Sequence, residues 1–130
     1  MKTIMMDEKK FWNIIKIANW AENCDFERIR QWFLLNVSKE EMQEFRNRFS
    51  EKFNELDTFI TPERNPAGGS DDSHSDLLSH IIGLGQEAFE AHLKDYQMIE
   101  NRGQAKYCSK DGYQESFRYC IPYENDYNKL

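Results

Sequence analysis

A regularly spaced row of apolar side chains in the first half of the chain constrains its fold more than any other feature. The row consists of Met42, Phe45, Phe49, Phe53 and Leu56. Steps of three or four residues place side chains on one face of an α-helix. The preceding Ser38-Lys39-Glu40-Glu41 is a capping box, a motif that begins helices. The sequence therefore predicts a long helix whose aromatic face enters a core rather than forming a ligand-binding box.

Two further helices are predicted before this one. Asp7 can cap the first, which extends to about Trp20 and carries a broad apolar stripe. The stripe consists of Phe11, Trp12, Ile14, Ile15, Ile17 and Ala18. Asp25 can cap the second helix. Its apolar residues again follow helical spacing: Phe26, Ile29, Trp32 and Phe33. Because both helices are short and a brief turn joins them, we expect them to pack antiparallel.

The helical pattern stops between Thr61 and Ser75. Two prolines and two glycines in this stretch prevent a continuous helix: Pro62, Pro66, Gly68 and Gly69. We therefore expect the main loop of the protein here. Loops of about fifteen residues are uncommon inside a compact domain and are often functional.

The C-terminal half is predicted to contain three more helices. A short apolar helix follows the loop and ends at Gly83 and Gly85, and residues 86–95 form the next one. A polar connection then leads to a last helix over residues 113–128. Pro122 falls inside this last helix and predicts a kink or a restart there.

Together these elements predict an all-α fold. We expect a single domain over residues 1–130, a bundle of about five or six helices with one long central loop. A chain of this length can bury a core without disulfides or metals. Aromatic residues, 14% of the total, supply core volume despite a mean hydropathy of −0.85. No run shows the alternation that is typical of β-strands.

The chain is acidic, with 17 Lys and Arg against 23 Asp and Glu and a net charge of −6. This charge disfavours nucleic acid and anionic membranes as partners. It suits a basic protein partner, although solubility alone also explains it.

The N-terminus lacks a signal-peptide pattern and no run could span a membrane, so we expect a cytoplasmic protein. Cys24, Cys108 and Cys120 lack metal-ligand spacing and are interpreted as ordinary thiols, with a Cys108–Cys120 disulfide as the alternative.

The most polar cluster lies at the end of the predicted loop. Asp71, Asp72, His74 and Asp76 place three carboxylates and an imidazole within six residues. Such groups could bind a divalent cation or act as a general base, but their spacing differs from that of an EF-hand loop. Helix capping and an acidic patch that faces a partner are the other interpretations. No spacing in the chain requires a cofactor, a metal or a nucleophile.

Tyrosines gather in the last quarter of the chain: Tyr107, Tyr113, Tyr119, Tyr123 and Tyr127. Tyrosine joins apolar area to a hydrogen-bonding tip and is common among interface anchors. Alternatively, part of this set closes the core over the helices. The last three recur every four residues, so a continuous helix would align them.

Several segments occur in a recognisable order along the chain. They are Phe11-Trp12, the capping box with its phenylalanine row, Leu56-Asp57-Thr58-Phe59, Gly68-Gly69-Ser70-Asp71-Asp72 followed by Asp76, and Gly85-Gln86-Glu87-Ala88-Phe89-Glu90-Ala91. In this order they resemble a bacterial family called domain of unknown function 4240. The resemblance covers most of the chain and implies an all-α domain without assigned catalytic residues.

The sequence departs from that family's usual pattern at Gly69, Ser73, Leu78, His80 and Gln86. Leu78 and Gln86 stand where the family typically has arginines. Without these arginines, a site that depends on an acid–arginine cluster is in doubt. Small bacterial proteins of this sort resemble immunity proteins, which are often encoded beside toxins, and the resemblance favours binding over catalysis.

From the sequence we therefore expect an immunity protein, an antitoxin without catalytic activity of its own, that binds a cognate bacterial toxin as a monomer in an equimolar complex. Toxins that act on nucleic acid, nucleotides or NAD, such as nucleases and ADP-ribosyltransferases, tend to have basic clefts that acidic and aromatic side chains could occlude. Blocking an activator of the toxin or distorting the toxin is the alternative mode of inhibition. The candidate contact residues are Glu63, Asp71, Asp72, His74, Asp76, Tyr119, Tyr123, Glu124, Asp126 and Tyr127. The alternatives are a regulatory or adaptor module unrelated to toxins and, less favoured, a metal-dependent enzyme that uses the Asp/His loop.

Overall fold

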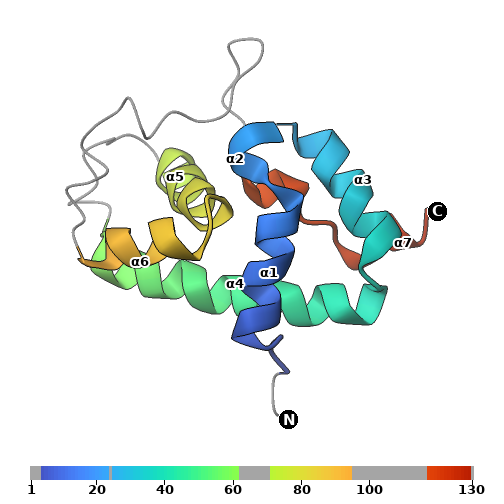
Figure 1. Cartoon of the computed structure of the whole chain (residues 1–130), viewed down its shortest axis with the longest axis horizontal. Helices are drawn as coiled ribbons and strands as arrows, with labels where there is room; N and C mark the ends of the chain where they lie inside the picture. The colour runs from blue at the N-terminus through green and yellow to red at the C-terminus, as the bar shows by residue number, and fades with distance from the viewer. Residues whose placement is uncertain (1–3, 24, 62–70, 95–116, 130) are drawn as a thin grey trace.

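The computed structural model describes residues 4–23, 25–61, 71–94 and 117–129 (Figure 1). The elements in these ranges are α1 (Glu8–Ala18), α2 (Trp20–Asn23), α3 (Phe26–Asn36), α4 (Lys39–Phe59), α5 (Asp71–Gly83), α6 (Gln86–Lys94), the 3-10 helix η3 (Phe117–Cys120) and α7 (Glu124–Tyr127). No strand occurs within the four described ranges. The prediction of an all-α domain is confirmed.

The longest of these helices, α4, runs along the lower edge of the view in Figure 1, and α2, α3 and α5 lie above it. It begins with the predicted capping box, in which the Glu41 amide donates to the Ser38 hydroxyl and the Ser38 amide donates to the Glu41 carboxylate. Met42, Phe45 and Leu56 are fully buried. The aromatic face predicted from their spacing therefore lies in the core.

The predicted caps of the two N-terminal helices are also present. Asp7 accepts a hydrogen bond from the Lys10 amide, and Asp25 accepts one from the Arg28 amide, both at 3.2 Å. Between these helices Asn19 adopts a left-handed conformation with a φ of 52°, which ends α1. The chain then passes through α2 into α3.

The structure corrects the predicted boundary of the central loop. Helix α5 begins at Asp71 rather than after Ser75, so its first turn lies inside the stretch that was predicted as loop. This turn is polar, and hydrophobic periodicity therefore could not reveal it. Acidic and hydroxyl side chains are nevertheless favoured where a helix begins.

The last helix is also different from the prediction. Among the described residues of this segment, only the 3-10 turn η3 and the one-turn helix α7 are helical, and Pro122 lies between them. Proline lacks an amide hydrogen and pushes the residue before it, here Ile121, away from helical geometry. The restart at Pro122 is correct, whereas a continuous helix over this segment is wrong. The first residues of the predicted helix lie outside the described ranges.

One polar pair is buried inside the aromatic core. The Trp20 indole Nε1 donates to His80 Nδ1 at 3.1 Å, and both side chains are buried. Because Nδ1 accepts, the neutral ring carries its proton on Nε2. Burial lowers the pKa of His80 to about 4, and the nearby His92 adds to this effect.

Gly83 lies where side chains of η3 and α2 come close to the backbone of α5. A Cβ at this position would lie 2.7 Å from Phe117 Cβ and 2.8 Å from Trp20 Cδ1. Although alanine is favoured over glycine inside helices by about 1 kcal/mol, we expect Gly83→Ala to destabilise the protein by about 1–3 kcal/mol through overpacking. Urea unfolding measures the change.

Gly85→Ala provides the comparison for this variant. A Cβ there meets nothing within 4 Å, but the φ of +116° strains any residue other than glycine. We expect Gly85→Ala to lose stability while the near-ultraviolet signal of the core stays unchanged. Wild-type or greater stability of Gly83→Ala would show that the core relaxes around the new methyl group.

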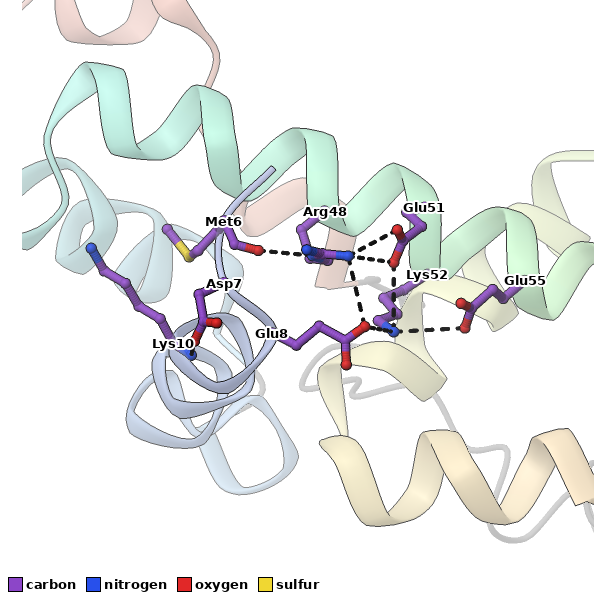
Figure 2. Close-up of polar contacts among 8 residues, drawn as sticks. All are labelled: Met6, Asp7, Glu8, Lys10, Arg48, Glu51, Lys52 and Glu55. Atoms are coloured by element: carbon purple, nitrogen blue, oxygen red, sulfur yellow. Dashed lines mark hydrogen bonds and ion pairs between the residues drawn. The ribbon is translucent and has the colours of Figure 1, made fainter. Parts of the chain in front are cut away.

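An ion-pair cluster joins the start of α1 to α4 (Figure 2). Lys52, whose side chain is only 7% exposed, places Nζ 2.9 Å from Glu8 and 3.6 and 3.7 Å from Glu51 and Glu55. Arg48 donates to the Met6 carbonyl at 2.8 Å. The hydrogen bond from Lys52 and its charge lower the pKa of Glu8. Five charged side chains, four on α4 and one on α1, thus hold the N-terminal segment in place.

Candidate protein-binding surface

The candidate contact residues at the end of the chain lie on one segment, residues 117–129, which we call the C-terminal strip (Figure 1). Its η3 turn packs against α3 and α5, and α7 packs against α4. Phe117 is fully buried and its ring lies 6.4 Å from that of Phe33 and 6.2 Å from that of Trp20. One aromatic side chain therefore anchors the beginning of the strip in the core.

An acid–arginine–tyrosine cluster connects the strip to α5. Arg118 Nε lies 2.7 Å from Asp76 Oδ1, and Arg118 Nη2 donates to the Tyr119 hydroxyl at 3.2 Å. The Arg118 guanidinium also lies over the Tyr119 ring, 5.1 Å from its centroid. Two predicted contact residues, Asp76 and Tyr119, are thereby brought together by an arginine that was not among the candidates. The structure thus contains an acid–arginine pair despite the two missing family arginines.

Asp126 and Glu124 bind cations of the neighbouring helices. Asp126 Oδ2 accepts hydrogen bonds from the Tyr123 amide at 2.7 Å and from Arg30 at 3.0 Å. The amide hydrogen bond and the Arg30 charge outweigh the effect of burial and lower the pKa of Asp126. Glu124 lies 3.2 Å from Lys39. The charges of both acids are therefore partly compensated within the chain.

The two remaining tyrosines of the strip point in different directions. The Tyr127 hydroxyl donates to the Val37 carbonyl at 2.8 Å, and burial raises the pKa of Tyr127 to about 12. Tyr123 instead lies on the surface, where Arg46 stacks on its ring at 5.7 Å and donates to the Pro122 carbonyl at 2.6 Å. Because no continuous helix forms, the four-residue spacing does not align these side chains.

The candidates around the central loop have different surroundings. His74 is buried, and its Nε2 lies 2.7 Å from Asp57 Oδ1 on α4. This pair holds the start of α5 to the end of α4. Asp71 and Asp72 lie in the first turn of α5, but their side chains are outside the described part of the structure, as is Glu63.

Two tyrosines are the predicted contact residues with large exposed apolar surface. Tyr119 is 41% exposed and Tyr123 is 64% exposed. Each stacks with an arginine, Arg118 or Arg46, and sequence reasoning missed both arginines. Tyrosine and arginine are the side chains enriched among residues that dominate protein–protein binding. The strip can therefore contact a protein through rings that its own arginines hold in position.

Two classes of feature are not found in the described part of the chain. In these ranges no three His, Cys, Asp or Glu side chains are grouped as a metal ion would require. The helices of these ranges also include none that is long and apolar enough to cross a bilayer.

The fold and the strip define a class: an all-α protein with exposed, arginine-stacked tyrosines on its C-terminal segment. The chain belongs to a family described as protein of unknown function (DUF4240), whose model matches residues 6–121. The match includes Asp76, Arg118 and Tyr119 and ends before Tyr123. No curated protein and no solved structure matches the chain.

Proposed function

We propose that this protein is an immunity protein, which binds a cognate bacterial toxin in the cytoplasm and neutralises it. The observation that carries the proposal is the pair of exposed tyrosines, Tyr119 and Tyr123, on a segment anchored to three helices. Side chains that are held in place before binding lose little conformational freedom on association. Such anchors suit an inhibitor that must bind its target tightly.

Charge supports the same proposal through the approach of the two proteins. A net charge of −6 attracts a basic surface and raises the rate of association. Active sites that act on nucleic acid, nucleotides or NAD are expected to be basic, and we propose a toxin of this class. Because Asp76, Glu124 and Asp126 already contact cations of this chain, we assign the binding energy mainly to the tyrosines and the long-range attraction to the acids.

A double variant tests this assignment. Tyr119→Ala/Tyr123→Ala removes both anchors, and residues of this kind typically contribute about 2 kcal/mol or more each. We therefore expect binding to the co-expressed toxin to weaken by at least about 100-fold. Growth rescue should be lost as well. Calorimetry or surface plasmon resonance measures the affinity, and a growth assay with the neighbouring toxin gene measures protection.

Ile17→Ala is the matched control, because Ile17 is also exposed but lies on α1. It should bind and protect like the wild type, and circular dichroism should show that all variants remain folded. Full protection by the double tyrosine variant would contradict the role of the strip. Absence of a toxin beside the gene would instead favour the adaptor alternative.

A further inference from the structure

A groove of about 960 Å³ lies on a part of the surface that shares no residue with the C-terminal strip. One wall is α1 and the other is the α5–α6 turn with the first half of α6, and both α1 and α6 pack against α4 (Figure 1). Leu84, which is half-buried, and the exposed edge of Trp12 contribute apolar atoms between the walls. The volume is at the upper end of the range of small-molecule sites.

The two walls carry opposite charges. Lys9 and Lys16 are seven residues apart on α1 and therefore lie on one stripe, two turns from each other. Glu87 and Glu90 are three residues apart on α6 and likewise share a face. All four side chains are exposed. In the described part of the chain none of them forms an ion pair.

We propose that this groove binds an α-helical segment of a partner protein. The segment carries carboxylates on one flank, basic side chains on the other and an apolar ridge between them. Its acids face Lys9 and Lys16, its bases face Glu87 and Glu90, and the ridge covers the apolar atoms between the walls. Helices commonly bind in grooves in this way.

The size and charge of the groove favour this occupant over two others. With 11 residues, α1 provides a wall of about 16 Å, enough for roughly three turns of a second helix. A small anion would be attracted by one wall and repelled by the other. A second copy related by a two-fold axis through the groove would place one groove over another and leave both unfilled.

A synthetic helix of about four turns is the probe. It has a leucine ridge, glutamates along one flank and lysines along the other, and carries no net charge. Amide chemical shifts should change in α1 and α6 and not in the C-terminal strip, and added salt should weaken the binding. Because the probe is synthetic, the result does not depend on whether the natural partner is a toxin.

Charge reversal makes the test specific. Lys9→Glu/Lys16→Glu makes both walls acidic, and the peptide should bind at least about tenfold more weakly. Adding Glu87→Lys/Glu90→Lys gives the two walls opposite charges again, now with α1 acidic and α6 basic. Turning a helix end to end exchanges its flanks, so this fourfold variant should bind again with the peptide reversed.

A spin label at the peptide N-terminus reports the direction. It should broaden signals at one end of α1 in the wild type and at the other end in the fourfold variant. Equal affinity for the wild type and the doubly acidic variant would overturn the proposal, as would the same peptide direction in both grooves. If inorganic phosphate binds and causes the same chemical-shift changes, the groove would be assigned to an anion. If the protein forms concentration-dependent dimers and Lys9→Glu/Lys16→Glu abolishes them, the groove would be assigned to a second copy.

Discussion

Phe117→Ala is expected to lower the free energy of unfolding by about 3–5 kcal/mol, the cost of deleting a buried phenylalanine ring. Phe117 is fully buried, and its ring lies 6.1 Å from Phe49 on α4 and 6.4 Å from Phe33 on α3. It also lies close to α5, because a Cβ added at Gly83 would be 2.7 Å from Phe117 Cβ. One truncation therefore opens a cavity among three helices. Urea unfolding with tryptophan fluorescence measures the loss.

Tyr119→Ala is the matched control for this variant, because Tyr119 lies two residues further on and is exposed. We expect Tyr119→Ala to lower the free energy of unfolding by less than about 1 kcal/mol. If the two truncations lower the free energy of unfolding equally, Phe117 does not anchor η3 in the core. Phe117→Ala should additionally weaken partner binding, because it releases the segment that carries both exposed tyrosines.

Acidification from pH 6.5 to pH 4 is expected to lower the free energy of unfolding by up to about 3 kcal/mol through His80 alone. Burial lowers the pKa of His80 to about 4 in the folded state, from the ordinary histidine value of about 6.5. Between these values the unfolded chain binds more protons than the folded one. Stability therefore rises with pH in this window and the contribution is complete above it.

His80→Gln should flatten this part of the pH profile, because glutamine does not titrate and its carbonyl oxygen can still accept from Trp20. His92→Gln is the control and should keep most of the slope, since burial is the larger cause of the His80 shift. Urea unfolding at fixed ionic strength gives the profile. An unchanged slope in His80→Gln would assign the acid sensitivity to other groups.

Carboxylates contribute in a different pH range. Hydrogen bonds and nearby cations lower the pKa values of Glu8, Glu41 and Asp126 in the folded state. The stability that these groups supply is present at neutral pH and is lost as pH falls below the usual carboxyl range, near pH 4. The His80 window lies above this range, so the two effects can be separated.

Features set by nearby residues could be predicted from the sequence. The capping box of α4 and the caps of α1 and α3 depend on side chains within three residues of the amides they bind. The buried Lys52 was missed, although a signal was present. Met42, Phe45, Phe49, Lys52 and Leu56 recur at alternating steps of three and four, so Lys52 continues the core row.

The candidate site was less predictable because its contacts join distant parts of the chain. Arg118 and Asp76 are far apart in sequence, and no spacing rule connects them. The same holds for Arg30 and Asp126, whose contact changes an acid from a surface charge into part of an ion pair. Tyr123 and Tyr127 share the spacing of a helix face, yet Tyr123 is the extended N-cap residue of α7 and Tyr127 lies inside that helix, so the two rings point in different directions.

In the C-terminal strip the inward residues are held by the core and the outward tyrosines by arginines on the surface. Phe117, Asp126 and Tyr127 hold it to the core, to Arg30 and to Val37. Tyr119 and Tyr123 could therefore be exchanged by mutation at little cost to folding. The surface that these two side chains form can therefore change during evolution while the helical scaffold stays the same.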